Sequence, residues 1–281
     1  MYSAARLKCG LRARIGGRLG GGARRPARAK TLQVAPRRCR GTARASMFFD
    51  RFPRFYETSE TAAYRGRLNL RYEAIFAENR DIFAGARVLD IASHDGRWSL
   101  AALKTGAAEV VGIEARDDLV TAARENLSLY IGDEGRYEFI AGDVFDVLSR
   151  QQPEADLILC LGYLYHTLRY NELMSRMRDV NPRYLVIDTQ VLPAETRRHV
   201  RLRLDRADRQ KNAAVDAFSH DGQTLVGKPS VPALEFMLNT FGFEIERFSD
   251  WGSLVRDNPR WPGVRAYAEG RRVTLRCVST S

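Results

Sequence analysis

The stretch that decides the fold is VLDIASHDGRWSL, residues 88–100. An apolar strand pattern, VLDIA, gives way to a short polar loop and then to the helical pattern that begins with RWSL. In an α/β sheet the ligand lies beyond the carboxyl ends of the strands, close to such a first loop. The loop from Ala92 to Gly96 is therefore where a ligand site is expected.

The polar side chains around this loop favour a cationic ligand. A dinucleotide site would have the pattern G-x-G-x-x-G here, so that bare backbone amides meet a pyrophosphate. Instead the strand carries Asp90 and the loop carries Asp95. Two carboxylates would repel a pyrophosphate, and they favour a positively charged cofactor.

Strand and helix patterns alternate through the rest of the chain. Five apolar runs are typical of buried parallel strands: 87–92, 109–115, 137–143, 156–162 and 183–190. Two later runs, 243–250 and 271–278, have no convincing helix between them and are expected to be antiparallel. The predicted fold class is α/β, with a Rossmann-like seven-stranded sheet, mostly parallel, a terminal antiparallel pair and helices on both faces.

Charge divides the chain into a tail and a core. The whole chain has 45 basic and 34 acidic residues, and residues 1–46 hold 13 of the basic ones and none of the acidic ones. Residues 47–281 therefore balance 32 basic against 34 acidic residues. We expect residues 1–46 to be a disordered basic extension. A mis-assigned start before Met47, an organellar targeting segment and a nucleic-acid-binding arm all fit this composition.

Residues 47–84 are expected to precede the main domain, which spans 85–281. Their aromatic stretch MFFDRFPRFYETSE is either a strap that seals the edge of the domain or a lid over a cleft. An amphipathic helix from Ser59 to about Phe83 follows it.

An insertion at residues 190–228 interrupts the domain. Its alternating pattern RHVRLRLDR predicts a half-buried strand whose polar face carries Arg201 and Arg203. These arginines are either a solvated edge or a site for an anionic group of the substrate.

Cysteine usage and other motifs narrow the chemistry further. Cys160 and Cys277 lie singly in apolar runs and there is no C-x-x-C pair, so buried free thiols in a reducing compartment are expected. We also expect a cytoplasmic protein with no membrane span, and chemistry that does not depend on a metal.

The order of acidic residues at the strand ends carries a family resemblance. Asp90 at the first loop, Glu114 closing the second strand, Asp143 after the third and the apolar fourth strand DLILCLG resemble class I S-adenosylmethionine-dependent methyltransferases over residues 86–281. Three stretches, LCLGYLYHTLRYNELMSRM, LVIDTQV and GKPSVPALEFMLNTFGFEIERF, are similar to the branch that contains the tRNA wobble-uridine carboxymethyltransferases.

The resemblance implies S-adenosyl-L-methionine as the cofactor and a set of residues that bind it: Asp90, Ala92, His94, Gly96, Glu114, Asp143 and Leu161. In this set Glu114 would accept hydrogen bonds from the ribose hydroxyls, and Asp143 from the adenine amino group. Alternatively, each of these two carboxylates only caps the helix that follows it.

The loop departs from the family pattern D-x-G-x-G-x-G at two positions. Ala92 and His94 stand where glycines are usual. Ala92 is tolerable if its φ is negative, whereas a left-handed His94 would be strained by roughly 1–2 kcal/mol.

The loop after the fourth strand supplies the candidate catalytic residues. Methyl transfer depends mainly on positioning, and a base is needed only if the acceptor starts protonated. His166 is the expected base, with Tyr165 beside it. Tyr163, Arg201 and Arg203 are expected to contact the substrate.

The predicted function is S-adenosylmethionine-dependent transfer of a methyl group to a small-molecule or lipid/glycan acceptor. The alternatives are an RNA-modifying (carboxy)methyltransferase and a non-catalytic module that binds the cofactor. A nicotinamide-dependent oxidoreductase is a weaker fourth reading.

Overall fold

The computed structural model describes residues 46–58, 64–132, 135–151, 153–206, 216–259 and 263–280. Contacts divide the chain into two units, residues 1–44 and 45–281, and every element below belongs to the second unit. The expected disordered extension, residues 1–46, lies outside the described residues except for Ser46, and so does the expected helix start at Ser59.

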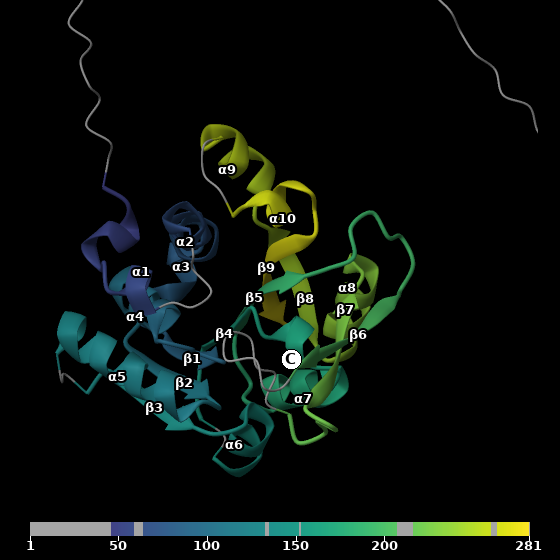
Figure 1. Ribbon diagram of the computed structural model, residues 1–281, viewed down its shortest axis with the longest axis horizontal. Helices are drawn as coiled ribbons and strands as arrows, with labels where there is room; N and C mark the ends of the chain where they lie inside the picture. The colour runs from purple at the N-terminus through teal and green to yellow at the C-terminus, as the bar shows by residue number, and fades with distance from the viewer. Residues whose placement is uncertain are drawn as a thin grey trace, which may run out of the picture. The chain divides into compact units, whose positions relative to one another are not determined.

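Seven strands form one sheet in the order β3-β2-β1-β4-β5-β9-β8 (Figure 1). Their bounds are β1 (Arg87–Ile91), β2 (Glu109–Glu114), β3 (Tyr137–Ala141), β4 (Leu157–Leu161), β5 (Tyr184–Gln190), β8 (Phe243–Phe248) and β9 (Arg272–Ser279). The first five strands are parallel, and β9 is antiparallel to both β5 and β8. The predicted fold class is confirmed.

Helices cover both faces because successive strand residues point to opposite sides of the sheet. Val88 packs in a core cluster with α4 (Arg97–Thr105) and α5 (Asp117–Ile131). Leu89 and Ile91 belong to a second cluster with α6 (Val144–Arg150), α7 (Tyr170–Asp179) and α8 (Val231–Thr240). The sheet is thus fixed between two packed layers of helices, which hold the carboxyl ends of its strands in place.

The N-terminal aromatic stretch packs into the first of these clusters. It folds as η1 (Phe48–Arg51) and α1 (Phe55–Thr58), and the side chains of Phe49 and Phe55 are fully buried. The ring of Phe48 stacks on that of Tyr72 with centroids 3.7 Å apart. This packing favours a strap over a movable lid.

The helical segment after the strap is not one regular helix. It consists of α2 (Arg65–Tyr72), a π-helical turn η2 (Glu73–Ala77) and α3 (Arg80–Phe83). The side chain of Asn79 donates to the carbonyls of Ala74 and Ile75, which satisfies backbone acceptors at the end of this turn.

The prediction that no helix joins the last two strands is wrong. The connection holds α9 (Trp251–Asp257) and α10 (Arg265–Ala268). The rings of Trp251 and Tyr267 stack with centroids 3.5 Å apart, and both pack with Leu70 and Ala74 of the N-terminal segment. Contacts distant in sequence therefore stabilise these short helices, which is why local pattern did not reveal them.

The insertion forms a separate hairpin of β6 (Val200–Arg206) and β7 (Gln223–Pro229). The predicted strand is present, but the prediction of a half-buried apolar face is wrong. Leu202 and Leu204 are 57% and 61% exposed. Among the described strands β6 pairs only with β7, so the large sheet does not cover this face.

Two smaller expectations concern cysteine and membranes. Cys160 and Cys277 are buried and free, as predicted. Within the described residues, no helix combines the length and apolar character needed to cross a bilayer.

Candidate functional site

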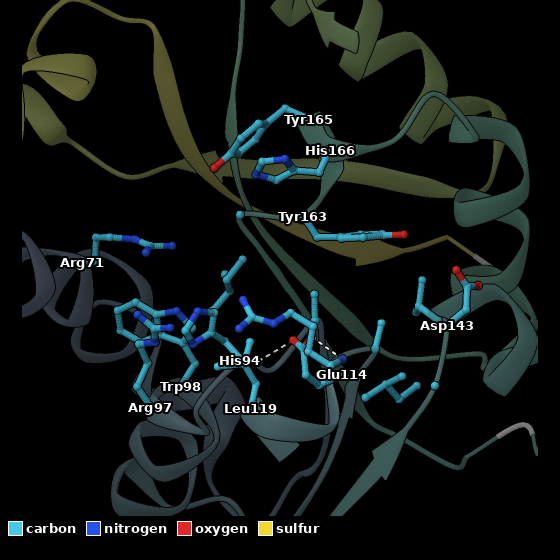
Figure 2. A pocket seen from close by; sticks show the side chains of 18 of the residues that line it. Arg71, His94, Arg97, Trp98, Glu114, Leu119, Asp143, Tyr163, Tyr165 and His166 are labelled. Atoms are coloured by element: carbon cyan, nitrogen blue, oxygen red, sulfur yellow. Dashed lines mark hydrogen bonds between the residues drawn. The ribbon is translucent and has the colours of Figure 1, made fainter. Parts of the chain in front are cut away.

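A pocket opens at the carboxyl ends of the central strands (Figure 2). Eight of the residues predicted from the sequence line it: Ala92, His94, Glu114, Asp143, Leu161, Tyr163, Tyr165 and His166. Four do not: Asp90, Gly96, Arg201 and Arg203. The parallel strands explain the convergence, because β1, β2 and β4 deliver their loops to the same edge of the sheet.

The first loop adopts the glycine-like backbone that its sequence lacks. Ala92 and His94 both have φ of 55°, in the left-handed region. Ala92 therefore does not meet the condition of a negative φ, and both residues carry strain of the order of 1–2 kcal/mol. The third position keeps its glycine, whose φ is 78°, and a Cβ on Gly96 would also lie 2.8 Å from the side chain of Leu127.

Glu114 ties this loop to the second strand. Its carboxylate accepts hydrogen bonds from the backbone N–H of His94, at 3.0 Å, and from that of Arg116, at 3.1 Å. One bond falls on each carboxylate oxygen, and each oxygen can accept another. Glu114 therefore holds the loop and can also accept hydrogen bonds from two neighbouring hydroxyl groups of a ligand in the pocket.

Asp90 lies beneath the pocket rather than in its wall. It is 1% exposed, accepts a hydrogen bond from the Ser99 hydroxyl at 2.7 Å, and its Oδ1 has no hydrogen-bond partner among the described residues. Burial raises the pKa of Asp90 to about 7. In the ligand-free protein this carboxyl is therefore substantially protonated near neutral pH.

Asp95 does not face the ligand as its sequence position suggested. Its carboxylate lies 2.7 Å from Nε of Arg97 and accepts from the Thr58 hydroxyl at 2.9 Å. Burial disfavours its charge, but Arg97 outweighs burial and holds the pKa of Asp95 at about 2. Asp95 thus anchors the strap to the loop, and its charge is already matched.

Asp143 combines both of the roles considered from the sequence. Its Oδ1 accepts from the backbone N–H of Phe145 at 2.8 Å and caps α6, while the residue also lines the pocket. Partial burial raises its pKa. Asp143 lies on the opposite side of the pocket from Arg71 (Figure 2).

The loop after β4 carries Tyr163 and the 3-10 turn η3 (Leu164–His166). Figure 2 shows Tyr165 and His166 side by side above Tyr163. Nδ1 of His166 lies 3.4 Å from Oδ2 of Asp205 in β6. The hairpin thus reaches this loop through Asp205, a residue that the sequence analysis missed although it alternates with Arg201 and Arg203.

Tyr165 has an unusual electrostatic environment. Its hydroxyl accepts a hydrogen bond from Nη1 of Arg272 at 3.2 Å. Burial alone would raise its pKa, but Arg272 and then His166 lower the pKa of Tyr165 to about 7. This phenol can lose or accept a proton near neutral pH.

Arg201 and Arg203 lie outside the pocket wall. Both are exposed, and Arg203 pairs with Asp205 at 2.6 Å. Asp205 also lies near His166, so it links Arg203 to the loop after β4. The predicted contact of these arginines with substrate stays a prediction.

The pocket instead contains five arginines that the sequence analysis did not assign to it: Arg67, Arg71, Arg97, Arg116 and Arg272. The only sequence signal was the spacing of Arg67 and Arg71, which puts both on one face of a helix. Nothing in the sequence indicated that Arg71 of this helix pairs with Asp188 of β5.

Comparison with known proteins places this site in a family context. Residues 88–181, about a third of the chain, match the family model described as a methyltransferase domain. A provisionally named ribosomal RNA large subunit methyltransferase of Methanocaldococcus jannaschii is 38% identical over 82 residues, which cover 29% of this chain and 21% of that protein. The chain therefore spans about a fifth of the length of this curated relative.

Solved structures with the same fold cover most of the chain. An S-adenosylmethionine dependent methyltransferase from Mesorhizobium loti aligns with a TM-score of 0.51 and 15% identity, over 74% of this chain and 97% of that one. A 1,6-didemethyltoxoflavin N1-methyltransferase from Burkholderia thailandensis, solved with S-adenosylhomocysteine, aligns with a TM-score of 0.52 and 16% identity, over 82% and 86%. The solved structures confirm the predicted fold, and the family model identifies a methyltransferase domain over residues 88–181. The likeness to the tRNA wobble-uridine branch stays a prediction.

Proposed function

We propose that this chain, whose methyltransferase domain has the fold of class I S-adenosylmethionine-dependent methyltransferases, binds S-adenosyl-L-methionine and transfers its methyl group to a small-molecule acceptor. The observation that carries the proposal is Glu114, a carboxylate at the end of β2 that lines the pocket with an acceptor site left on each oxygen.

The other pocket residues fit the same cofactor. Asp143 can accept from an exocyclic amine, and four apolar side chains that line the same pocket can contact a flat base: Ile113, Leu119, Val144 and Leu161. Asp90 adds a buried carboxyl with an unpartnered oxygen below the loop. An ammonium group nearby would favour its charged form.

The residues after β4 would then act on the acceptor. The cofactor supplies a methyl group on a sulfonium, which needs little beyond an in-line approach by the nucleophile. Tyr165 and His166 border the pocket, and either can accept a proton from a hydroxyl or amine acceptor. Asp205 would act as a positioning residue by fixing the imidazole of His166.

An RNA acceptor is the second candidate. It is supported by the name of the partial relative from Methanocaldococcus jannaschii and by the five arginines in the pocket. Residues 47–281 hold 32 basic and 34 acidic residues, so this part of the chain has no net positive charge to attract a phosphate backbone. We therefore favour a small acceptor.

The test is calorimetric titration of the protein with S-adenosylmethionine, S-adenosylhomocysteine and NAD. We expect the first two to bind and NAD not to. Glu114→Gln removes a charged acceptor of hydrogen bonds, so it should weaken binding by about 10- to 100-fold. Glu109→Gln, at the exposed opposite end of the same strand, is the matched control and should change nothing.

If neither sulfur nucleoside binds, the cofactor assignment is wrong. If both bind and Glu114→Gln keeps full affinity, the cofactor lies elsewhere in the pocket.

A further inference from the structure

Three guanidinium groups gather around a single carboxylate at one end of the pocket. Arg67 and Arg71 lie four residues apart on α2, Arg272 begins β9, and Asp188 lies in the neighbouring strand β5. All three arginines line the pocket, whereas Asp188 is fully buried behind them. We refer to Arg67, Arg71 and Arg272 as the guanidinium cluster.

The carboxylate of Asp188 has no capacity left for a further donor. Its Oδ2 accepts from the hydroxyls of Thr274 and Tyr267, at 2.7 and 2.8 Å. Its Oδ1 accepts from Nη2 of Arg71 at 3.1 Å and from Nε of Arg272 at 2.6 Å. Four bonds use the roughly four lone-pair positions of a carboxylate, so Asp188 cannot accept from the remaining donors of the three guanidinium groups.

Donors of the cluster remain without acceptors. Nε of Arg71 is buried and has no hydrogen-bond partner among the described residues. Arg67 likewise makes no hydrogen bond or ion pair that can be identified within the described ranges of the chain. Burial, followed by repulsion from Arg71 and Arg272, lowers the pKa of Arg67. Buried donors such as Nε of Arg71 are normally satisfied, and the oxygens of an anion in the pocket could accept from both arginines.

The cluster lies toward the end of the pocket away from Glu114. From β2, which carries Glu114, the sheet passes through β1 and β4 to β5 and then β9. Asp188 of β5 accepts from Arg71 and Arg272, and a Cβ on Gly162, just after β4, would lie 3.3 Å from Nη2 of Arg272. The cluster therefore lies beside the residues after β4, which are the candidates to act on the acceptor.

We propose that the guanidinium cluster binds an anionic group, a carboxylate or a phosphate, on the methyl acceptor. The proposal rests on the proposed function, because it assigns the far end of the same pocket to the acceptor. Arginine suits this role, since its planar donors match the oxygens of both groups. Bound in this way, the acceptor would lie against Tyr165, whose hydroxyl already accepts from Arg272.

Tyr165 supplies a direct readout of an anion in the cluster. Without a ligand, Arg272 and His166 favour its tyrosinate form, since its pKa is about 7. A bound anion would replace the tyrosinate as the matching charge, and the phenol would take up a proton. Tyrosinate differs from tyrosine in ultraviolet absorbance. Subtracting the spectrum of the Tyr165→Phe variant from that of the full-length protein therefore isolates the signal of Tyr165.

The experiment measures this difference at pH 8 while inorganic phosphate or succinate is added at constant ionic strength. We expect the tyrosinate signal to fall with saturation, and the anion with the lower half-saturation identifies the preferred group. Arg67→Gln should raise the half-saturation concentration about tenfold, and Arg67→Lys should recover part of the loss. Arg65→Gln, on the same helix but outside the pocket wall, is the matched control and should behave as the wild type.

Calorimetric titration of the same proteins with S-adenosylhomocysteine separates the two proposals. Its affinity should be the same in Arg67→Gln and wild type. If wild type fails to bind it yet responds to the anions, the proposed function fails and the anion site stands. The anion proposal is overturned if neither anion changes the tyrosinate signal, if Arg67→Gln matches wild type, or if S-adenosylhomocysteine competes with both anions.

Discussion

Two non-glycine residues in the first loop have backbone conformations that ordinarily favour glycine. Ala92 and His94 have φ of 55°, and the loop is nevertheless held by the bond from the His94 N–H to Glu114. The energy of this strain must be offset by the rest of the fold. Such strain persists where surrounding structure determines it, and it is concentrated at functional sites.

Replacing Ala92 with glycine should therefore stabilise the protein. Relief of left-handed strain gains about 1–2 kcal/mol, and the added freedom of the unfolded chain removes about 0.4–1 kcal/mol of that. We expect the free energy of unfolding in urea to rise by about 0.5–1 kcal/mol. The control is Ala122→Gly in α5, which should lose about 1 kcal/mol because that position is helical. Equal losses in both variants would contradict the strain.

Asp90 should make stability depend on pH. Its folded pKa is about 7, whereas an unfolded aspartate ionises near pH 4. The unfolded chain therefore releases this proton first, and the contribution of Asp90 to stability is fully present below about pH 4 and lost as pH rises through 7. Asparagine does not titrate, so Asp90→Asn should exceed wild type at pH 8 by up to about 4 kcal/mol.

Urea unfolding of wild type and Asp90→Asn between pH 4 and 8 tests this. The gap between the two proteins should close toward pH 4. A gap that stays constant with pH would mean that Asp90 is not buried as a neutral acid.

Among the elements, the N-terminal strap shows that its closely spaced aromatic residues belong to the core. Phe49 is fully buried and makes edge contacts with Phe55 and Trp98, at centroid distances of 5.8 Å each. A segment packed in this way is part of the core, so removing one ring should cost global stability.

We expect Phe49→Ala to lower the free energy of unfolding by about 3–5 kcal/mol. Phe218→Ala is the control, since Phe218 is 74% exposed and its loss should cost less than about 1 kcal/mol. A lid would give the opposite signature, with little loss of stability and a change in ligand affinity. Denaturant unfolding and calorimetric titration of both variants distinguish the two.

The elements also mark what the sequence could and could not predict. Short apolar runs such as 156–162 identify buried strands because both faces of a parallel strand are covered. The alternation in β6 predicted the strand correctly but not its exposure, which depends on what packs against it. The sequence did not predict the helices α9 and α10, because Trp251 and Tyr267 in them pack against Leu70 and Ala74, which lie far away in sequence.

At the scale of the whole molecule, the site was predictable only where it follows strand ends. Glu114 and Asp143 come directly from β2 and β3, so topology alone locates them. The guanidinium cluster joins a helix before the sheet to its last strand, over more than 200 residues of sequence. No local pattern encodes that meeting.

The uneven charge of the chain gives one further prediction. Residues 67–272 supply the whole described pocket, and residues 1–46 supply the excess basic charge. A chain beginning at Met47 should bind S-adenosylhomocysteine with unchanged affinity but lose binding of single-stranded RNA at low salt. Calorimetry and filter binding test the two halves of this expectation, and salt-sensitive RNA binding that survives truncation would assign it to the folded domain.

The position of β9 has a consequence for synthesis. This strand follows all the other described strands in sequence, yet it lies between β5 and β8 in the sheet. Until the ribosome has synthesised Arg272–Ser279, β5 lacks its neighbour, and Asp188 lacks both Arg272 and Thr274. A nascent chain that stops short of β9 therefore cannot assemble the guanidinium cluster, and activity should arise only after this strand has left the ribosome.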